Sequence, residues 1–260
     1  MINKINWKEY VDHIFCLNYL PNNRLNKISK TLENIGININ DSNFFSFIYD
    51  YEHCIFKDQY QNMKEESFKF FNENKYFINS HLNLETNDYG FYIGLNTYRA
   101  LKIAQHFNYD RIIIFEDDIA FLKDINYIIN AMNFVKTQDF DICMCQTTFM
   151  EAYHGIKSYL LDYVEDLGND MFIKFNRPIG TYGGGFIILT NKGINKIVKY
   201  FEDNNLMVAL DVLDTLIDKM KLEVLYALKP LCVQNIHFDI SKEELYERNA
   251  NINIEEYEQN

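Results

Sequence analysis

Three adjacent carboxylates, Glu116, Asp117 and Asp118, directly follow the most apolar run of the chain, residues 111–115 (RIIIF). Carboxylates this close repel one another, so a compact site keeps them ionised only beside a cation or several hydrogen-bond donors. Mg²⁺ and Mn²⁺ are typically held by one or two protein carboxylates, while substrate phosphates and water complete the shell. The triplet therefore predicts a divalent metal site that binds a diphosphate ligand.

The alternative interpretation of the triplet is a solvated acidic turn, and its position in the chain argues against that. An unbroken apolar strand implies burial on both faces, as at the centre of a parallel sheet. In open parallel sheets, ligands bind at the carboxyl ends of the strands. We therefore expect the three carboxylates at a solvent-facing strand end, where removal of Asp118 leaves the fold intact.

Segments with strand-like and helix-like patterns alternate around this central strand. Apolar runs predict strands at 11–17, 44–49, 111–115, 141–147, 186–189 and 223–228. Helical periodicity predicts helices at 24–34, 93–107, 125–135, 194–201 and 212–220. The order predicts an α/β fold with a central, mostly parallel sheet flanked by helices. We expect one domain over residues 1–240 and an acidic C-terminal tail over residues 241–260.

Charge and composition exclude several classes of protein. The net charge of −12 opposes binding to a nucleic-acid backbone, which depends on Lys and Arg meeting phosphates. No stretch approaches the ~20 apolar residues of a membrane span, and charges interrupt the N-terminal segment where a signal peptide would be apolar. The cysteines are odd in number, and most lie in apolar runs, as buried free thiols do. We expect a reduced, cytoplasmic protein. The five cysteines are Cys16, Cys54, Cys143, Cys145 and Cys232.

Glycine-rich phosphate-binding motifs are absent from the sequence: neither a P-loop nor a G-x-G-x-x-G fingerprint occurs, and there is no G-x-S-x-G elbow. The triple glycine at 183–185 would let a backbone approach a ligand closely, although a simple turn before a strand explains it equally well. We therefore expect the phosphates to be held by the carboxylate site rather than by a glycine-rich loop.

Several segments, taken together, resemble glycosyltransferase family 25, the lipooligosaccharide-type galactosyltransferases with a GT-A fold. The resemblance spans most of residues 11–237, and the order of the segments is more specific than any one of them. The chain departs from the family at two places: Leu95-Asn96-Thr97 stands where the family commonly has Ser-His, and the glycine stretch is longer. The similar segments are IFCLNYLPNNR, RIIIFEDDIAFL, GTYGGGFIILTNKGINKI, ALDVLDTLI and LKPLCVQN.

The resemblance implies an activity and its partners. The chain would move a hexose such as galactose from a nucleotide-diphosphate sugar, typically a UDP-sugar, to a saccharide acceptor of lipooligosaccharide or another surface glycan. The reaction would invert the anomeric carbon and depend on Mn²⁺ or Mg²⁺. A cytoplasmic protein in peripheral contact with the inner face of the membrane fits such an acceptor.

The resemblance also implies site residues, each of which has a simpler alternative role. Metal ligands would be Asp118, Glu116 and His237. Donor-binding residues would be Asn18, Arg24, Asp50, Arg99, Glu116 and Asp117, and acceptor-binding residues would be Thr181, Tyr182 and Gly184. The alternatives are turn residues for Asn18 and Asp50, solvated helix cations for Arg24 and Arg99, and a hydrogen-bonded loop residue for His237.

An inverting transfer needs a base on the acceptor hydroxyl. Asp211 is the first candidate and Asp214 the second, because residues three apart on a helix can face the same cleft. The alternative is that Asp211 only caps its helix, a role that asparagine and serine fill equally well.

Two other functions compete with glycosyl transfer. A nucleotidyltransferase would use the same carboxylates and metal on a nucleoside triphosphate. A non-catalytic carbohydrate-binding protein would keep the fold without the chemistry. The released product separates the first rival from a glycosyltransferase, because only the glycosyltransferase releases a nucleoside diphosphate as it transfers the sugar.

Overall fold

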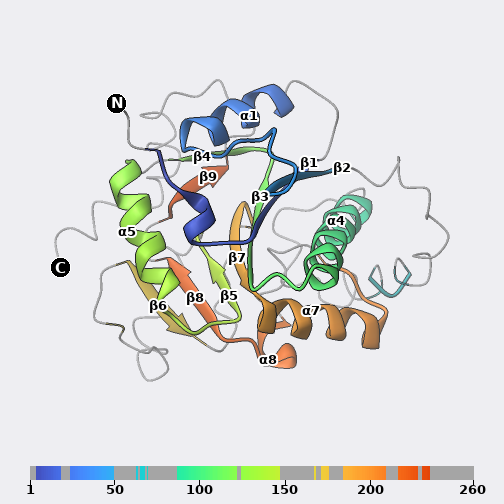
Figure 1. The fold of residues 1–260 in the computed structure, drawn as a ribbon. Coiled ribbons are helices and arrows are strands. Elements are labelled where there is room, and N and C mark those ends of the chain that lie inside the picture. Colours follow the sequence, from blue (N-terminus) through green and yellow to red (C-terminus); the bar gives the residue numbers. More distant parts are fainter. Residues whose placement is uncertain are drawn as a thin grey trace, which may run out of the picture.

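The computed structural model describes residues 4–18, 24–49, 63, 65–67, 69, 87–121, 124–146, 167, 171–175, 184–208, 216–227 and 230–234 (Figure 1). The predicted acidic tail, 241–260, lies outside these residues, and the single domain stays a prediction. No helix among the described residues is long and apolar enough to cross a membrane.

A seven-stranded sheet with the order β2-β1-β3-β7-β5-β8-β6 forms the centre of the molecule. Five strands run in one direction, while β6 and β7 run against their neighbours. This confirms the predicted α/β class with a mostly parallel sheet. The strands are β1 (His13–Asn18), β2 (Phe45–Tyr49), β3 (Arg111–Glu116), β5 (Ile142–Met144), β6 (Phe172–Phe175), β7 (Phe186–Thr190) and β8 (Val224–Ala227).

Helices cover both faces of this sheet (Figure 1). On one face lie α4 (Asn87–His106), α7 (Asn191–Asn204) and α8 (Ile217–Met220). On the other face lie α1 (Arg24–Asn34), α5 (Ile125–Lys136) and the 3-10 helix η1 (Trp7–Glu9). Side chains of β3 alternate between the two cores, with Ile112 and Ile114 in the first, and Ile113 and Phe115 in the second. The prediction that this strand is buried on both faces is confirmed.

Two short strands beyond the main sheet correct the prediction. β4 (Ile119–Phe121) follows the acidic triplet and pairs antiparallel with β9 (Cys232–Gln234). The apolar pattern does not predict β4, because three residues are too few to establish a period. β6 was missed for a related reason, since its four residues, FIKF, occur within a long segment without clear periodicity. The predicted strand at 141–147 shortens to β5.

Side-chain caps begin the helices that follow two of the strands. Asp124 accepts hydrogen bonds from the backbone N–H groups of Asn126 and Tyr127 at the start of α5. Thr190 accepts one from Gly193 at the start of α7, and Asn205 ends that helix in the left-handed conformation. These caps satisfy backbone donors that a helix cannot pair internally.

Candidate functional site

The carboxyl ends of three parallel strands meet at one edge of the sheet. Leu17 of β1 pairs with Glu116 of β3, and Asn18 pairs with Tyr49 of β2. The acidic triplet begins at Glu116, with Asp117 and Asp118 forming the turn that leads into β4. The sheet therefore places the triplet and the backbone of Asn18 at one edge, as the sequence predicted.

Arg24, the first residue of α1, lies beside the triplet. Its Nη1 is 3.3 Å from Oδ1 of Asp117, and the two side chains are 26% and 4% exposed. A largely buried carboxylate is thereby given a cationic partner from a different element of the fold. Arg24 is thus not simply a solvated cation at a helix start, which was the alternative interpretation.

Asp118 is buried, with only 8% of its surface exposed. The expectation of a solvent-facing carboxylate is therefore wrong, because β4 folds back immediately after the turn and pairs with β9. Within the structure, Oδ1 of Asp118 has no hydrogen-bond partner. Burial and then the charge of Asp117 raise the pKa of Asp118 to about 6, while Arg24 acts in the opposite direction. A proton or a cation would relieve this buried charge.

Buried thiols lie near the triplet. Burial, followed by the charges of the triplet, raises the pKa of both Cys16 and Cys232 well above the ordinary value. Cys143 and Cys145 have their sulfurs 3.7 Å apart, and all four cysteines are free. In the described part of the chain, no group of three or more His, Cys, Asp or Glu side chains could hold a metal. These thiols pack in the apolar core on one face of the sheet.

The carboxylates of the triplet could supply one or two ligands to a hard divalent cation, but not a complete coordination shell. Asp118 contributes a buried oxygen with no protein partner, and Glu116 is a half-buried carboxylate two residues away. One or two carboxylates suffice for Mg²⁺ or Mn²⁺ when a substrate diphosphate supplies further oxygens. The third predicted ligand, His237, lies outside the described residues.

Glu116 also belongs to a row of residues that crosses three strands. Its N–H donates to the carbonyl oxygen of Gly185 at 3.1 Å, just before β7. On the other side of β7, the N–H of Cys145 donates to Phe186 at 2.9 Å, which places Gln146 opposite Gly185. Gln146 is 4% exposed, and its Oε1 has no hydrogen-bond partner in the structure.

Gln146 was missed in the sequence because no motif surrounds it. Its only signal is its place in the predicted strand 141–147, close to the carboxyl end, where ligands bind in such sheets. A glutamine near the end of a strand does not by itself mark a binding residue.

Of the other predicted site residues, the structure describes Gly184 and Arg99. Gly184 is buried next to Gly185, and so lies at the same edge as Glu116. Arg99 lies on α4, where its Nη1 donates to Oδ1 of Asn96 at 3.1 Å. The predicted residues that lie outside the described part of the chain are Asp50, Thr181, Tyr182, Asp211, Asp214 and His237.

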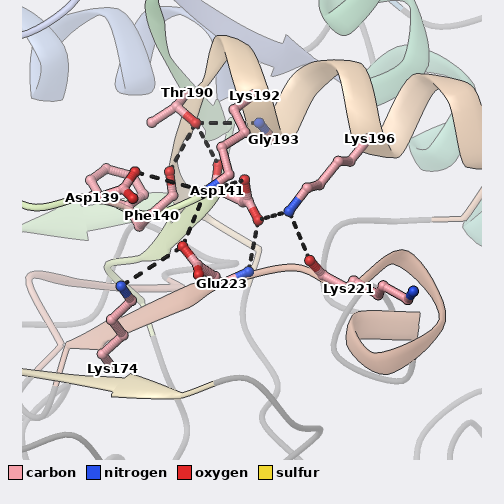
Figure 2. Close-up of polar contacts among 10 residues, drawn as sticks. All are labelled: Asp139, Phe140, Asp141, Lys174, Thr190, Lys192, Gly193, Lys196, Lys221 and Glu223. Atoms are coloured by element: carbon pink, nitrogen blue, oxygen red, sulfur yellow. Dashed lines mark hydrogen bonds and ion pairs between the residues drawn. The ribbon is translucent and has the colours of Figure 1, made fainter.

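A second polar cluster, centred on Asp141, lies at the opposite edge of the sheet (Figure 2). Oδ2 of Asp141 accepts from Nζ of Lys196 at 2.5 Å and from the N–H of Glu223 at 2.8 Å. Lys192 lies 3.6 Å from Oδ1. Thr190, in the same cluster, pairs with Arg111 at the start of β3 and is therefore a full strand away from Glu116. The cluster joins α7 to β5 and β8 rather than serving the acidic triplet.

Comparisons with known proteins show only distant likenesses. No protein-family model matches the sequence, and no curated protein matches it. A similar solved structure is that of A197 from STIV, with 11% identity, 89% of this chain and 91% of that chain covered, and a TM-score of 0.41. Mouse xyloside xylosyltransferase 1 in its apo form is similar with 8% identity, 80% of each chain covered and a TM-score of 0.36. One distant neighbour is thus a glycosyltransferase, but similarity at this level carries no argument about activity.

Proposed function

We propose that the chain transfers a sugar from a nucleotide-diphosphate sugar to an acceptor hydroxyl, with the diphosphate bound at the acidic triplet. One observation carries this proposal: the carboxyl edge of β1, β2 and β3 holds a buried carboxylate, Asp118, whose Oδ1 has no partner. Ligands bind at this edge in parallel sheets. A buried acceptor without a donor is costly, so it calls for a partner, and a cation bound with a diphosphate would supply one.

The charges of the site favour a cation together with a diphosphate. Arg24 is paired with Asp117, and one guanidinium offsets only part of the charge of three neighbouring carboxylates. Asp118 and Glu116 would hold Mn²⁺ or Mg²⁺, which when bound supplies a Lewis acid for the leaving diphosphate. Arg24 holds Asp117 in place, and its guanidinium is also the kind of group that binds phosphate oxygens well.

The remaining roles in the proposal come from the resemblance to family 25. Asn18, Asp50 and Arg99 contact the donor, while Thr181, Tyr182 and Gly184 contact the acceptor. Asp211 or Asp214 accepts the proton of the acceptor hydroxyl, and His237 completes the metal shell. The donor is a UDP-hexose such as UDP-galactose, the acceptor is a surface glycan such as lipooligosaccharide, and the protein acts at the inner face of the membrane.

A thermal-shift screen tests the proposal, since a ligand that binds only the folded state stabilises it by mass action. UDP, UDP-galactose and UDP-glucose are each added with and without Mn²⁺. We expect UDP and at least one of the UDP-sugars to raise the Tm in the presence of Mn²⁺, and Asp118→Asn to remove most of that increase. Asp203→Asn, an exposed carboxylate on α7, is the matched control and should behave as wild type.

Product analysis separates glycosyl transfer from the competing functions. Release of UDP from a UDP-sugar supports the proposal. Release of pyrophosphate from a nucleoside triphosphate would instead identify a nucleotidyltransferase. Binding of sugar without any turnover would identify a carbohydrate-binding protein.

A further inference from the structure

The row that joins Glu116, Gly185 and Gln146 contains a second buried acceptor without a partner. Oε1 of Gln146 and Oδ1 of Asp118 are both buried and without hydrogen bonds. Oε1 of Gln146 and Cγ2 of Ile119, the residue that follows Asp118, both lie within 2.7 Å of where a Cβ on Gly185 would stand. Nearly all buried polar groups are hydrogen-bonded, so these two acceptors call for a partner. Oδ1 of Asp141 also lacks a hydrogen bond, but it has a cation, Lys192, 3.6 Å away.

Gly185 determines where the carboxamide of Gln146 lies. A Cβ on Gly185 would collide with Oε1 of Gln146, so the amide occupies space that any other residue type would fill. In the row, Gly185 stands between Gln146 and Glu116. The carboxamide therefore extends from the end of β5 over Gly185, on the side of the acidic triplet.

The chemistry of an unpaired carbonyl oxygen limits what it can bind. Oε1 only accepts hydrogen bonds, so this unpaired atom takes a hydroxyl or an N–H as its partner, and not a phosphate oxygen. Arg24, the cationic group, contacts Asp117 in the turn after Glu116, whereas Gln146 is separated from Glu116 by Gly185 in the row. A nucleotide-diphosphate sugar suits both groups if its phosphates face Arg24 and the triplet. Its sugar then faces Gln146, next to β7 and β5.

We propose that Gln146 accepts a hydrogen bond from a hydroxyl of the donor sugar, and that Gly185 leaves the space in which its carboxamide does so. The proposal deepens the glycosyltransferase function and rests on it. It assigns an orientation to the donor along the sheet edge and makes Gln146 a residue that discriminates between sugars.

The test compares UDP with a UDP-sugar in Gln146→Ala and Gln146→Met. The probe is whichever of UDP-galactose and UDP-glucose raises the Tm of the wild type more with Mn²⁺, and dissociation constants are measured by calorimetry. We expect UDP affinity within about twofold of wild type and UDP-sugar affinity lowered by about tenfold, as for the loss of one hydrogen bond. Gln105→Met, on the surface of α4, is the control and should leave both affinities unchanged.

Stability without ligand distinguishes a binding role from a structural one. Methionine matches the length of glutamine without an acceptor, so Gln146→Met should keep or raise the Tm of the ligand-free protein, since it removes an unpaired buried oxygen. A clear fall in that Tm would show that Gln146 is a structural residue and would overturn the proposal.

Gly185 is tested by a double-mutant cycle. Gly185→Ala should lower UDP-sugar affinity by displacing the carboxamide, and adding Gln146→Ala should cause little further loss, because both changes remove one interaction. Fully additive losses would show that Gly185 does not act through Gln146.

Failure of the inference differs from failure of the proposed function. If the wild type binds neither UDP nor a UDP-sugar with Mn²⁺, both are overturned. If the wild type binds the UDP-sugar and both Gln146 variants bind it equally well, only the inference is overturned.

Discussion

At the scale of single residues, the main feature is a carboxylate held where its charge is unfavourable. Asp118 is buried beside Asp117, and burial is the larger cause of its raised pKa. The folded state therefore binds a proton more tightly than the unfolded chain does between about pH 4 and 6. In the proposed function, a divalent cation would replace this proton.

The first prediction concerns stability against pH. Because the folded pKa is raised from 3.8 to about 6, the contribution of Asp118 is fully present below about pH 4 and is lost as pH rises through 6. The loss is about 3 kcal/mol of unfolding free energy at neutral pH. Asp118→Asn should therefore be more stable than wild type at about pH 7.5 but not at about pH 4, as measured by urea denaturation. Equal differences at both pH values would contradict the raised pKa.

The second prediction concerns Arg24, which lowers the pKa of Asp118. Arg24→Gln is introduced into the wild type and into Asp118→Asn. It should move the pH-dependent stability difference between those two proteins to higher pH, because a positive neighbour is lost. It should also weaken UDP binding. Lys102→Gln, which breaks an exposed pair with Glu202, is the control. It should change neither the pH midpoint of the stability difference nor the affinity for UDP. An unchanged midpoint would show that Arg24 does not act on Asp118.

The third prediction concerns the proposed base. Asp211→Asn keeps the size and any capping bond but removes basicity, so transfer should fall by about two to four orders of magnitude. Donor binding and stability should stay near those of wild type. If Asp214→Asn has this effect instead, the two roles are exchanged. If both variants stay active, the base is another residue.

At the scale of elements, the Asp141 cluster holds α7 against the sheet (Figure 2). Asp141 precedes β5, Lys196 belongs to α7, and Glu223 precedes β8. Gly193 is part of the same contact, because a Cβ there would collide with the carbonyl oxygen of Asp141. One buried carboxylate and one glycine thus fix how closely α7 approaches β5.

The fourth prediction follows from this contact. Asp141→Asn removes the charge that Lys196 and Lys192 pair with, and should lower the free energy of unfolding by about 1–3 kcal/mol. Gly193→Ala should cost about the same through overpacking. Asp139→Asn, a carboxylate that is 80% exposed, is the control with little effect. UDP affinity of the folded variants should be unchanged, since the cluster lies at the far edge of the sheet.

At the scale of the whole molecule, the sheet separates two edges with different roles. At the Glu116 edge, the buried Oδ1 of Asp118 and Oε1 of Gln146 have no hydrogen-bond partner. At the other edge, Asp141 pairs with Lys196 through Oδ2, and its Oδ1, which also lacks a hydrogen bond, lies 3.6 Å from Lys192. The acidic edge is built from β1, β3, β4 and α1, so a ligand there links several elements. Its binding should therefore stabilise the fold as a whole.

The fifth prediction concerns metal removal. Mn²⁺ and UDP together at about 100 times the dissociation constant should add about 2.7 kcal/mol to the free energy of unfolding. Excess chelator should remove that increase and abolish transfer, and added Mn²⁺ or Mg²⁺ should restore both. Full turnover in chelator would exclude a role for the metal in the departure of the diphosphate.

The sequence by itself determined the α/β class, the central buried strand and the position of the triplet at its end. These follow from local patterns, since an apolar run that ends abruptly in carboxylates needs no knowledge of distant contacts. The burial of Cys16, Cys143, Cys145 and Cys232 was predictable for the same reason, because most of the cysteines lie in apolar runs.

Only the tertiary structure decided which residues meet the triplet and how deeply it is buried. Arg24 and Asp117 are 93 positions apart. β4, which follows the buried Asp118, pairs with β9, a strand far along the chain. The carboxamide of Gln146 lies over Gly185, on the side of Glu116, because β7, which Gly185 precedes, inserts between β3 and β5. Strand order depends on contacts between segments far apart in the chain, and no local pattern of residues records such contacts.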